Sequence, residues 1–461
     1  MWNRAHIVRV IWIPTLAFQF FFLHGDGTMI SFPFGSDKHI VLVLLSLLIF
    51  GPGGLQAGNW PDFRGPKANG HVDGELPREW SEKKNVIWKT PIHDRGWSTP
   101  AIWGDQVWLT TASNDGTRFY GVAIDRKTGV VLMDKLLFRS AKPEPLGNKV
   151  NTYASPSPVI DEERVYLHFG SYGTVCFDTK TLKPLWERTD FPCLHFRGPG
   201  SSPFIYKDTL ILTFDGVDFQ YLVALDRRTG KTLWRRDRST DFKDLDQEGK
   251  PAAGGDFRKA YNTPIIAPMA DGSVQLISPG ARAAWAYNPN TGAELWQLPY
   301  DQFSGAARAI FEKGTAYINS GYSKADLYAV ELTGHERGTL EESSIKWVSS
   351  KRIPNRSSVI MIGGRLYFVN DGGVASCVEP ETGEVIWSER LKGQFSSSPI
   401  YAGGVLYLFN EQGAAFLIEP GPEFKLLQEN QLDDGMLASP SSDGKDLYLR
   451  TKTHLYRISS S

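Results

Sequence analysis

Cysteine is scarce in this sequence, which has three in 461 residues, at positions 176, 193 and 377. An odd number without a closely spaced pair does not build a disulfide framework. A bridge between Cys176 and Cys193 remains an alternative, but it depends on a separation that sequence cannot establish. We expect buried free thiols instead. None of the cysteines follows an apolar run, so we expect no lipid anchor.

The sequence also lacks an excess of charge of one sign. It has 50 Lys and Arg against 51 Asp and Glu, a formal net charge of -1. No overall field therefore attracts nucleic acid or anionic lipid, and we expect neither as a partner.

Long apolar runs are missing too, and the N-terminal region indicates a targeting segment. The run Ile40–Phe50 has only eleven residues, whereas a membrane helix needs about 20. Lys38 precedes this run and small residues follow it up to Ala57, an order typical of a secretory signal. We therefore predict a signal segment over residues 1–57, with translation starting at Met29.

An earlier apolar stretch, Ile7 to Leu23, leaves an alternative open. It would form a membrane anchor, although Arg9 and Pro14 interrupt it. We expect an exported protein, periplasmic or secreted, that stays at the membrane only if its signal is not cleaved.

Catalytic and metal-binding motifs are absent from the sequence. It has no His-Glu-x-x-His helix motif and no Gly-x-Ser-x-Gly elbow. Beyond the signal region, no two histidines have metal-ligand spacing. Gly230-Lys-Thr232 resembles the end of a phosphate loop, but Leu225 stands where that motif needs glycine. Asp215 precedes a glycine and is better explained as a turn residue than as a base or calcium ligand. We predict no catalytic residue and no metal ligand.

What the sequence does have is an internal repeat after residue 85. Its fullest copy runs from Ala224 to Trp234 and reads Ala-Leu-Asp-Arg-Arg-Thr-Gly-Lys-Thr-Leu-Trp. Four copies depart from it, with Asn288 and Glu379 in place of aspartate, Leu182 in place of glycine and Met133 in place of tryptophan. The positions that carry the pattern are Asp125, Asp178, Trp186, Asp226, Gly230, Trp234, Gly292, Trp296, Gly383 and Trp387.

A second phrase precedes each copy and consists of small residues, often followed by proline, then an alternating apolar run. Its clear occurrences end at Pro100, Pro158, Pro203, Pro264, Pro399 and Pro440, and weaker ones start near Gly305 and Ser358. Together the two phrases define eight units of four short strands each. Four strands per unit at this spacing are typical of a propeller. We predict an all-β, eight-bladed β-propeller of four-stranded antiparallel blades over residues 85–461.

The chemistry of the repeat is structural. The Asp accepts hydrogen bonds from its own turn, the Gly supplies positive φ, and the Trp is expected to lie between neighbouring blades. The last unit lacks a fourth strand, and a spare strand around Trp88 is predicted to supply it and so remove two open sheet edges. Residues 58–84 are expected to be a lead-in that crosses the domain surface.

Three long loops give the site prediction: Lys135–Tyr153, 188–200 and 236–262. They precede the inner strands of blades two, three and four, and should open on one face near the central channel. Loops of this length are usually functional, although plain surface decoration is the alternative. The candidate binding residues are His195 and Arg197 near the centre, with Arg95, Trp97, Tyr261 and Arg356 around them.

These repeats resemble the pyrroloquinoline-quinone (PQQ) repeat. That family includes the eight-bladed quinoprotein alcohol dehydrogenases and the propeller lipoprotein that helps to assemble outer-membrane β-barrels. The phrase Trp60-Pro-Asp-Phe-Arg-Gly65-Pro is also similar to the entry of exported propellers from planctomycete-type bacteria. The resemblance implies the fold, but a propeller hosts both catalysts and scaffolds.

The resemblance implies a cofactor only if the dehydrogenase residues are present. Those enzymes have adjacent cysteines over the quinone, a calcium-binding Glu and Asn, and a catalytic Asp, and adjacent cysteines do not occur here. We therefore predict a monomeric, non-catalytic scaffold without a cofactor, which binds a protein, peptide or small ligand on the long-loop face. The alternative is a PQQ-dependent oxidoreductase with an atypical site that would need PQQ and calcium.

Overall fold

The computed structural model describes residues 22–23, 29–30, 58–147, 150–322 and 324–460. The chain divides into two compact units, Met1–Gly54 and Leu55–Ser461. In the first, β1 (Phe22–Leu23) pairs antiparallel with β2 (Met29–Ile30). The rest of the predicted signal segment lies outside the described residues. Neither of the two short helices in the described part of the chain is long and apolar enough to cross a membrane.

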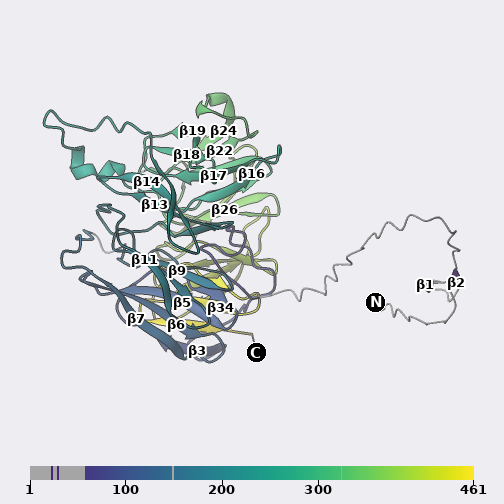
Figure 1. Cartoon of the computed structure of the whole chain (residues 1–461). Helices are drawn as coiled ribbons and strands as arrows, with labels where there is room; N and C mark the ends of the chain where they lie inside the picture. Colours follow the sequence, from purple (N-terminus) through teal and green to yellow (C-terminus); the bar gives the residue numbers. More distant parts are fainter. Residues whose placement is uncertain (1–21, 24–28, 31–57, 148–149, 323, 461) are drawn as a thin grey trace, which may run out of the picture. The chain divides into compact units, whose positions relative to one another are not determined.

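The second unit is an eight-bladed β-propeller, as predicted (Figure 1). Each blade is an antiparallel sheet whose strands run from the channel outward. Blade one consists of β4 (Ala101–Trp103), β5 (Gln106–Ala112), β6 (Arg118–Asp125) and β7 (Val131–Arg139), and blade two of β8 (Val159–Ile160), β9 (Arg164–His168), β10 (Thr174–Asp178) and β11 (Pro184–Arg188). Blade three consists of β12 (Phe204–Tyr206), β13 (Thr209–Asp215), β14 (Gln220–Asp226) and β15 (Thr232–Asp237), and blade four of β16 (Ile265–Pro268), β17 (Val274–Pro279), β18 (Ala283–Tyr287) and β19 (Glu294–Pro299).

The remaining blades follow the same order. Blade five consists of β20 (Ile310–Glu312), β21 (Thr315–Asn319), β22 (Leu327–Glu331) and β24 (Ile345–Ser349), and blade six of β25 (Ile360–Ile362), β26 (Arg365–Val369), β27 (Val374–Val378) and β28 (Val385–Arg390). Blade seven consists of β29 (Ile400–Ala402), β30 (Val405–Phe409), β31 (Ala414–Ile418) and β32 (Leu426–Gln431), and blade eight of β33 (Ser441–Ser442), β34 (Leu447–Arg450), β35 (His454–Ile458) and β3 (Val86–Pro91). Blade four has a fifth strand, because β23 (Gly338–Thr339) pairs parallel with β19. The short helices are η1 (Ala252–Arg258) and η2 (Glu342–Ser344).

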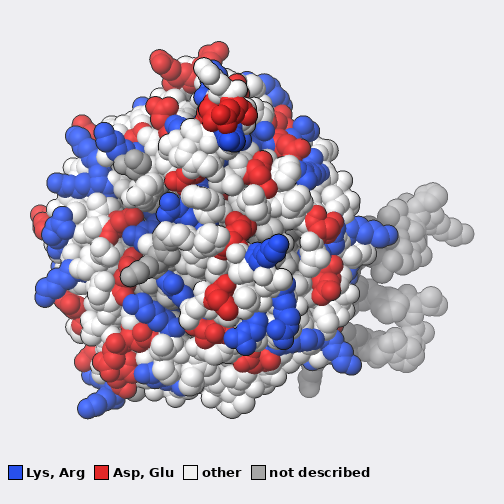
Figure 2. Space-filling model, turned by 90° about the vertical axis from the view of Figure 1, so that its left-hand side faces the viewer, with Lys and Arg blue, Asp and Glu red and all other residues white. Residues whose placement is uncertain are grey.

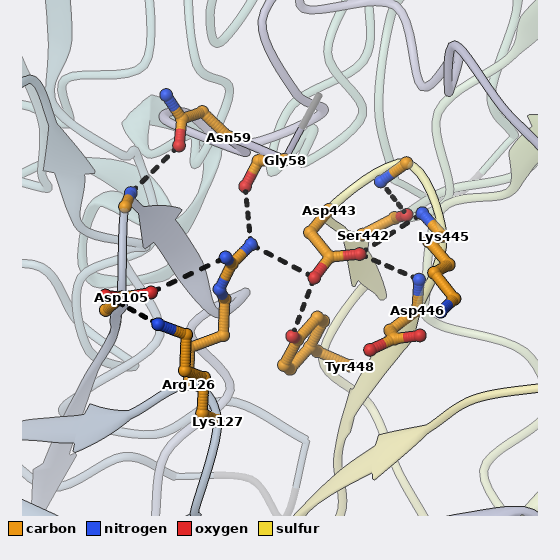
Figure 3. A network of polar contacts seen from close by, with 12 residues as sticks. Gly58, Asn59, Asp105, Arg126, Lys127, Ser442, Asp443, Lys445, Asp446 and Tyr448 are labelled. Carbon is orange, nitrogen blue, oxygen red and sulfur yellow. Dashed lines mark hydrogen bonds and ion pairs between the residues drawn. The ribbon is translucent and has the colours of Figure 1, made fainter. Parts of the chain in front are cut away.

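The ring closes as predicted, because β3 pairs antiparallel with β35 and completes blade eight. Side chains reinforce the adjoining seam between blades eight and one (Figure 3). Arg126 Nη1 lies 3.1 Å from Asp443 Oδ2, and Tyr448 donates its hydroxyl to the same carboxylate at 3.0 Å. Arg126 also donates to the carbonyl of Gly58. The two ends of the propeller are therefore joined by backbone pairing and by an ion pair.

The repeat residues hold neighbouring blades together. Asp226 Oδ1 accepts hydrogen bonds from the backbone N–H groups of Arg228 and Thr229 at 3.1 and 2.7 Å, which fixes the turn before β15. Gly230 in this turn has φ +72°, and the ring of Trp186 from the previous blade lies directly against it. The indole of Trp186 donates to the carbonyl of Arg227 at 3.1 Å. The same contact joins Trp88 to Gly129, Trp234 to Gly292 and Trp347 to Gly383, so in these blades the tryptophan fills the space that the glycine of the next blade leaves.

Small hydroxyl residues line the channel because they hydrogen-bond from one inner strand to the next. The backbone N–H groups of Thr99, Ser157 and Ser202 each donate to a hydroxyl on the following blade at 2.9–3.0 Å. In blade five the equivalent position is Arg308, whose N–H donates to Ser358 Oγ at 2.9 Å. This exception explains why the Ser-Pro phrase is weak in that blade.

The cysteines are free and buried, as expected.

Candidate functional site

The lead-in segment lies across the central channel. Trp60 exchanges backbone hydrogen bonds with Ile102 of blade one at 2.8 and 2.9 Å, and Pro61 accepts from the N–H of Ile160 in blade two at 2.9 Å. Trp60 is 1% exposed and Arg64 is 2% exposed. The expectation that this segment crosses the domain surface is therefore wrong for residues 60–65. These residues close the channel, and we call them the plug.

Two buried arginines anchor the plug to the opposite side of the channel, Arg308 from blade five and Arg64 from the plug itself. Arg308 of blade five donates to the carboxylate of Asp62 at 3.0 and 3.3 Å and also to the carbonyl of Phe63. Arg64 donates to the carbonyls of Pro399 and Val359, which directly precede the inner strands of blades seven and six. Because blades on both sides of the axis contribute, the plug is fixed at the centre of the ring.

The plug divides the channel into two cavities. The cavity on the long-loop face has a volume of about 440 Å³ and has Phe63 of the plug among its lining residues. The cavity on the other face has a volume of about 660 Å³ and is lined in part by Pro61 and Asp62. We call the first one the loop-face cavity.

All eight blades contribute residues to the loop-face cavity. Its walls combine aromatic rings, a circle of hydroxyl groups and a few charged side chains. Among its lining residues are Trp97, Thr99, Ser157, Arg197, Ser202, Asp256, Lys259, Tyr261, Thr263, Phe303, Tyr322, Arg356, Asp371, Ser398 and Ser439. A volume of this size, with an apolar wall and a few polar groups, is typical of a site for a small ligand or a short peptide segment.

The structure brings four of the six candidate residues together in this cavity, namely Trp97, Arg197, Tyr261 and Arg356. Arg95 does not line the cavity but stacks on Trp97, with its guanidinium carbon 5.2 Å from the ring centre.

His195 lies elsewhere and has a structural environment. It is 5% exposed, and its Nε2 accepts the backbone N–H of Ser171 at 3.0 Å. Its Nδ1 lies 3.6 Å from Cys193 Sγ, and its ring stacks on Phe214. Desolvation lowers the pKa of His195 to about 4, so the imidazole is neutral near pH 7. His195 ties its loop to blade two and does not face the loop-face cavity.

Residues 135–139, Arg188 and residues 236–237, expected in the loops, belong to β7, β11 and β15. The described residues of the long loops are 140–147 with 150–158, 189–203 and 238–264. They lie on one side of the propeller (Figure 1, left), and Figure 2 shows acidic and basic side chains interspersed over that face. The loops are interlocked. Asn151 Nδ2 donates to the carbonyl of Arg197 at 2.7 Å, and the Phe196 N–H donates to the carboxylate of Glu144 at 2.8 Å. One connected rim therefore surrounds this sector of the cavity.

Sequence reasoning missed three charged residues of the cavity wall, Asp256, Lys259 and Asp371. Lys259 contacts the carboxylate of Asp256, and the same carboxylate lies 3.8 Å from Arg197 Nη2. Burial lowers the pKa of Lys259 to about 7, the Arg197 charge adds to this effect, and the Asp256 contact opposes it. Across the cavity, Arg356 pairs with Asp371 at 2.9 Å. No motif or period marks such loop charges, so only the fold could reveal them.

The residues present do not fit a calcium-bound quinone. Within the described ranges, no three His, Cys, Asp or Glu side chains gather as metal ligands would. The two carboxylates of the cavity wall, Asp256 and Asp371, are already engaged by Lys259 and Arg356. No cysteine is among the residues that line the cavity. A divalent cation prefers carboxylate oxygens that are free to coordinate it, and this wall does not offer them.

Comparison with known proteins agrees with this architecture. The model of a protein family described as outer membrane protein assembly factor BamB matches residues 85–246, 218–345 and 286–420. The chain belongs to this BamB family. The BamB protein of Shewanella oneidensis is 24% identical over 207 residues, which cover 36% of this chain and 51% of that protein. This match thus spans about half of the relative's length.

Solved structures show the same fold. BamB from Moraxella catarrhalis has a TM-score of 0.54 at 11% identity and covers 81% of this chain and 99% of its own. The quinohemoprotein alcohol dehydrogenase of Comamonas testosteroni has a TM-score of 0.60 at 12% identity, covering 88% and 81%. The same propeller thus occurs in BamB and in an alcohol dehydrogenase, so the fold alone does not decide between binding and catalysis.

Proposed function

We propose that this BamB-family chain is an exported, non-catalytic scaffold that binds a protein, peptide or small ligand in the loop-face cavity. One observation carries the proposal: the three long loops and the ring of inner strands converge on a single cavity closed below by the plug. Four residues selected from the sequence for binding line it together. The name of the family, an outer membrane protein assembly factor, supports a role in holding other proteins.

Export follows from the predicted signal over residues 1–57, and the mature chain would then contain the plug together with the propeller of residues 85–461. Mass spectrometry of the protein isolated from its native host tests this part. A mature chain that begins near residue 58 supports export, and a chain that retains the apolar run 40–50 contradicts cleavage.

Binding at the loop-face cavity is tested by site-specific photocrosslinking in the native host. A benzoylphenylalanine replaces Tyr322, which lines the cavity and is 56% exposed. The matched control replaces Leu233, which is 55% exposed on the outer strand of blade three. We expect a discrete adduct from position 322 and none from 233. No adduct at 322, or equal adducts at both positions, contradicts the proposal.

A further inference from the structure

Two long loops place two cations around one carboxylate in the wall of the loop-face cavity. Arg197 comes from loop 189–203, and Lys259 and Asp256 come from loop 238–264. Asp256 contacts Lys259 and lies 3.8 Å from Arg197 Nη2. We call these three residues the loop cluster. With Lys259 protonated, the loop cluster carries one more positive than negative charge.

The excess charge is partly withdrawn from water. The side chain of Lys259 is 2% exposed, and that of Arg197 is 35% exposed. The rings of Phe196 and Phe303 lie 5.1 and 5.8 Å from Lys259 Nζ and shield it further. An unmatched charge in such a place is costly, and a second anion would offset that cost.

Two donors beside the excess charge are unused. Arg197 Nε and the hydroxyl of Tyr261 are buried and make no hydrogen bond within the described part of the chain. Both residues line the loop-face cavity. Burying a polar group without a partner destabilises the protein, so an incoming acceptor would satisfy two such groups at once.

We propose that the loop cluster and Tyr261 form a carboxylate-binding site, and that the ligand joins its carboxylate to an aromatic or apolar body. A guanidinium presents two parallel N–H groups that match the two oxygens of a carboxylate. Trp97, Phe303 and Tyr322 line the same cavity and supply apolar surface for the rest of the ligand. The inference rests on the proposed function, since it assigns the chemistry of the ligand that the cavity binds.

Such a carboxylate has two sources, the C-terminus of a peptide and a free organic acid. Both present the same group to Arg197, and a cavity of about 440 Å³ has room for either. Titration with matched probes separates them. The probes are N-acetylphenylalanine, a heptapeptide that ends in phenylalanine with a free carboxylate, and the same heptapeptide as its C-terminal amide.

Binding should also depend on pH through Lys259. Its pKa is lowered to about 7 by burial and by Arg197, and a bound carboxylate would raise it again. Arg197 and Asp256 are the charged groups that act on Lys259 most directly, and Arg282 lies on the same Phe303 ring. Burial raises the pKa of the Tyr261 phenol in the same cavity, which therefore stays neutral. Affinity for the acid should thus fall as the pH rises from 7 to 9. Lys259→Arg keeps a permanent charge and should remove that fall.

The experiment uses the full chain and calorimetric titration with each probe. We expect the free-acid heptapeptide to bind at least tenfold more tightly than its amide, and Arg197→Met to abolish the difference. Arg235→Met, an exposed arginine on the outer strand of blade three, should leave it unchanged. Tighter binding of N-acetylphenylalanine than of the heptapeptide identifies a free acid as the ligand, and the reverse identifies a peptide terminus.

Equal affinity for the acid and the amide, or discrimination that survives Arg197→Met, overturns the carboxylate assignment and leaves the cavity as a binding site. Failure of every probe overturns the assignment as well. The proposed function is decided by crosslinking alone, and it fails if Tyr322 gives no adduct or no more adduct than Leu233, so the two failures are distinguishable.

Discussion

Replacing Asp62 by asparagine should destabilise the propeller through the plug. Arg308 has a side chain that is 0% exposed, and Asp62 is the carboxylate that pairs with it. Removing one partner of a buried pair leaves the other charge uncompensated, which costs about 3–5 kcal/mol. Arg308 keeps acceptors at the carbonyls of Phe63 and Pro264, so we expect the lower end, about 3 kcal/mol.

Urea titration of the wild type and the Asp62→Asn variant measures this loss of unfolding free energy. The matched control is Asp237→Asn in the exposed pair with Arg235, where less than about 1 kcal/mol should be lost. The double variant Asp62→Leu with Arg308→Met should be more stable than either single change, because no lone charge is left buried. If Asp62→Asn lowers the free energy of unfolding no more than the surface control does, the ion pair of Asp62 with Arg308 does not hold the plug.

Three further predictions concern the blades and the site. Gly230→Ala should reduce the free energy of unfolding more than Gly272→Ala. Both glycines have positive φ, which costs alanine about 1–2 kcal/mol, but only at Gly230 would the new carbon lie 2.7 Å from the Trp186 ring. Equal losses of unfolding free energy in urea titration would contradict the packing of Trp186 on Gly230. Lowering the pH from 6.5 to 4 should destabilise the wild type, since the unfolded chain protonates His195 near 6.5 and the folded chain only near 4. The expected loss of unfolding free energy is about 3 kcal/mol, and the His195→Gln variant should lose less over that pH range. Parallel pH profiles of stability for the two proteins would exclude His195 as the group responsible. Adding PQQ and calcium should leave the melting temperature unchanged, and a saturable rise would restore the oxidoreductase alternative.

The repeat made the blades predictable because each unit carries the same local chemistry. Asp226, Gly230 and Trp186 act over one turn and one neighbouring blade, so the pattern is visible along the chain. Closure by the strand around Trp88 was predictable for a related reason, since an incomplete last unit and a spare strand complement each other.

The plug was not predictable in the same way, because it depends on residues 246 positions apart in the chain, Asp62 and Arg308. A signal was nevertheless present, since blade five lacks the hydroxyl residue that other blades carry at the Arg308 position. His195 was placed wrongly near the cavity centre because exposed and buried residues alternate over 191–196, and sequence alone did not show that this ring turns inward. Lys259 and Asp256 lie in a loop without any repeat, and only the fold brings them to Arg197.

Because of the plug, the cavity can form only after almost the whole chain has been synthesised. Residues 60–65 leave the ribosome before any blade, yet their partners Arg308 and Pro399 are made much later. Strand β3 likewise can pair with β35 only after the far end of the chain has been synthesised. A nascent or truncated molecule therefore has open blades but neither a closed ring nor a floor to its cavity. The ability to hold a ligand there would distinguish finished molecules from unfinished ones.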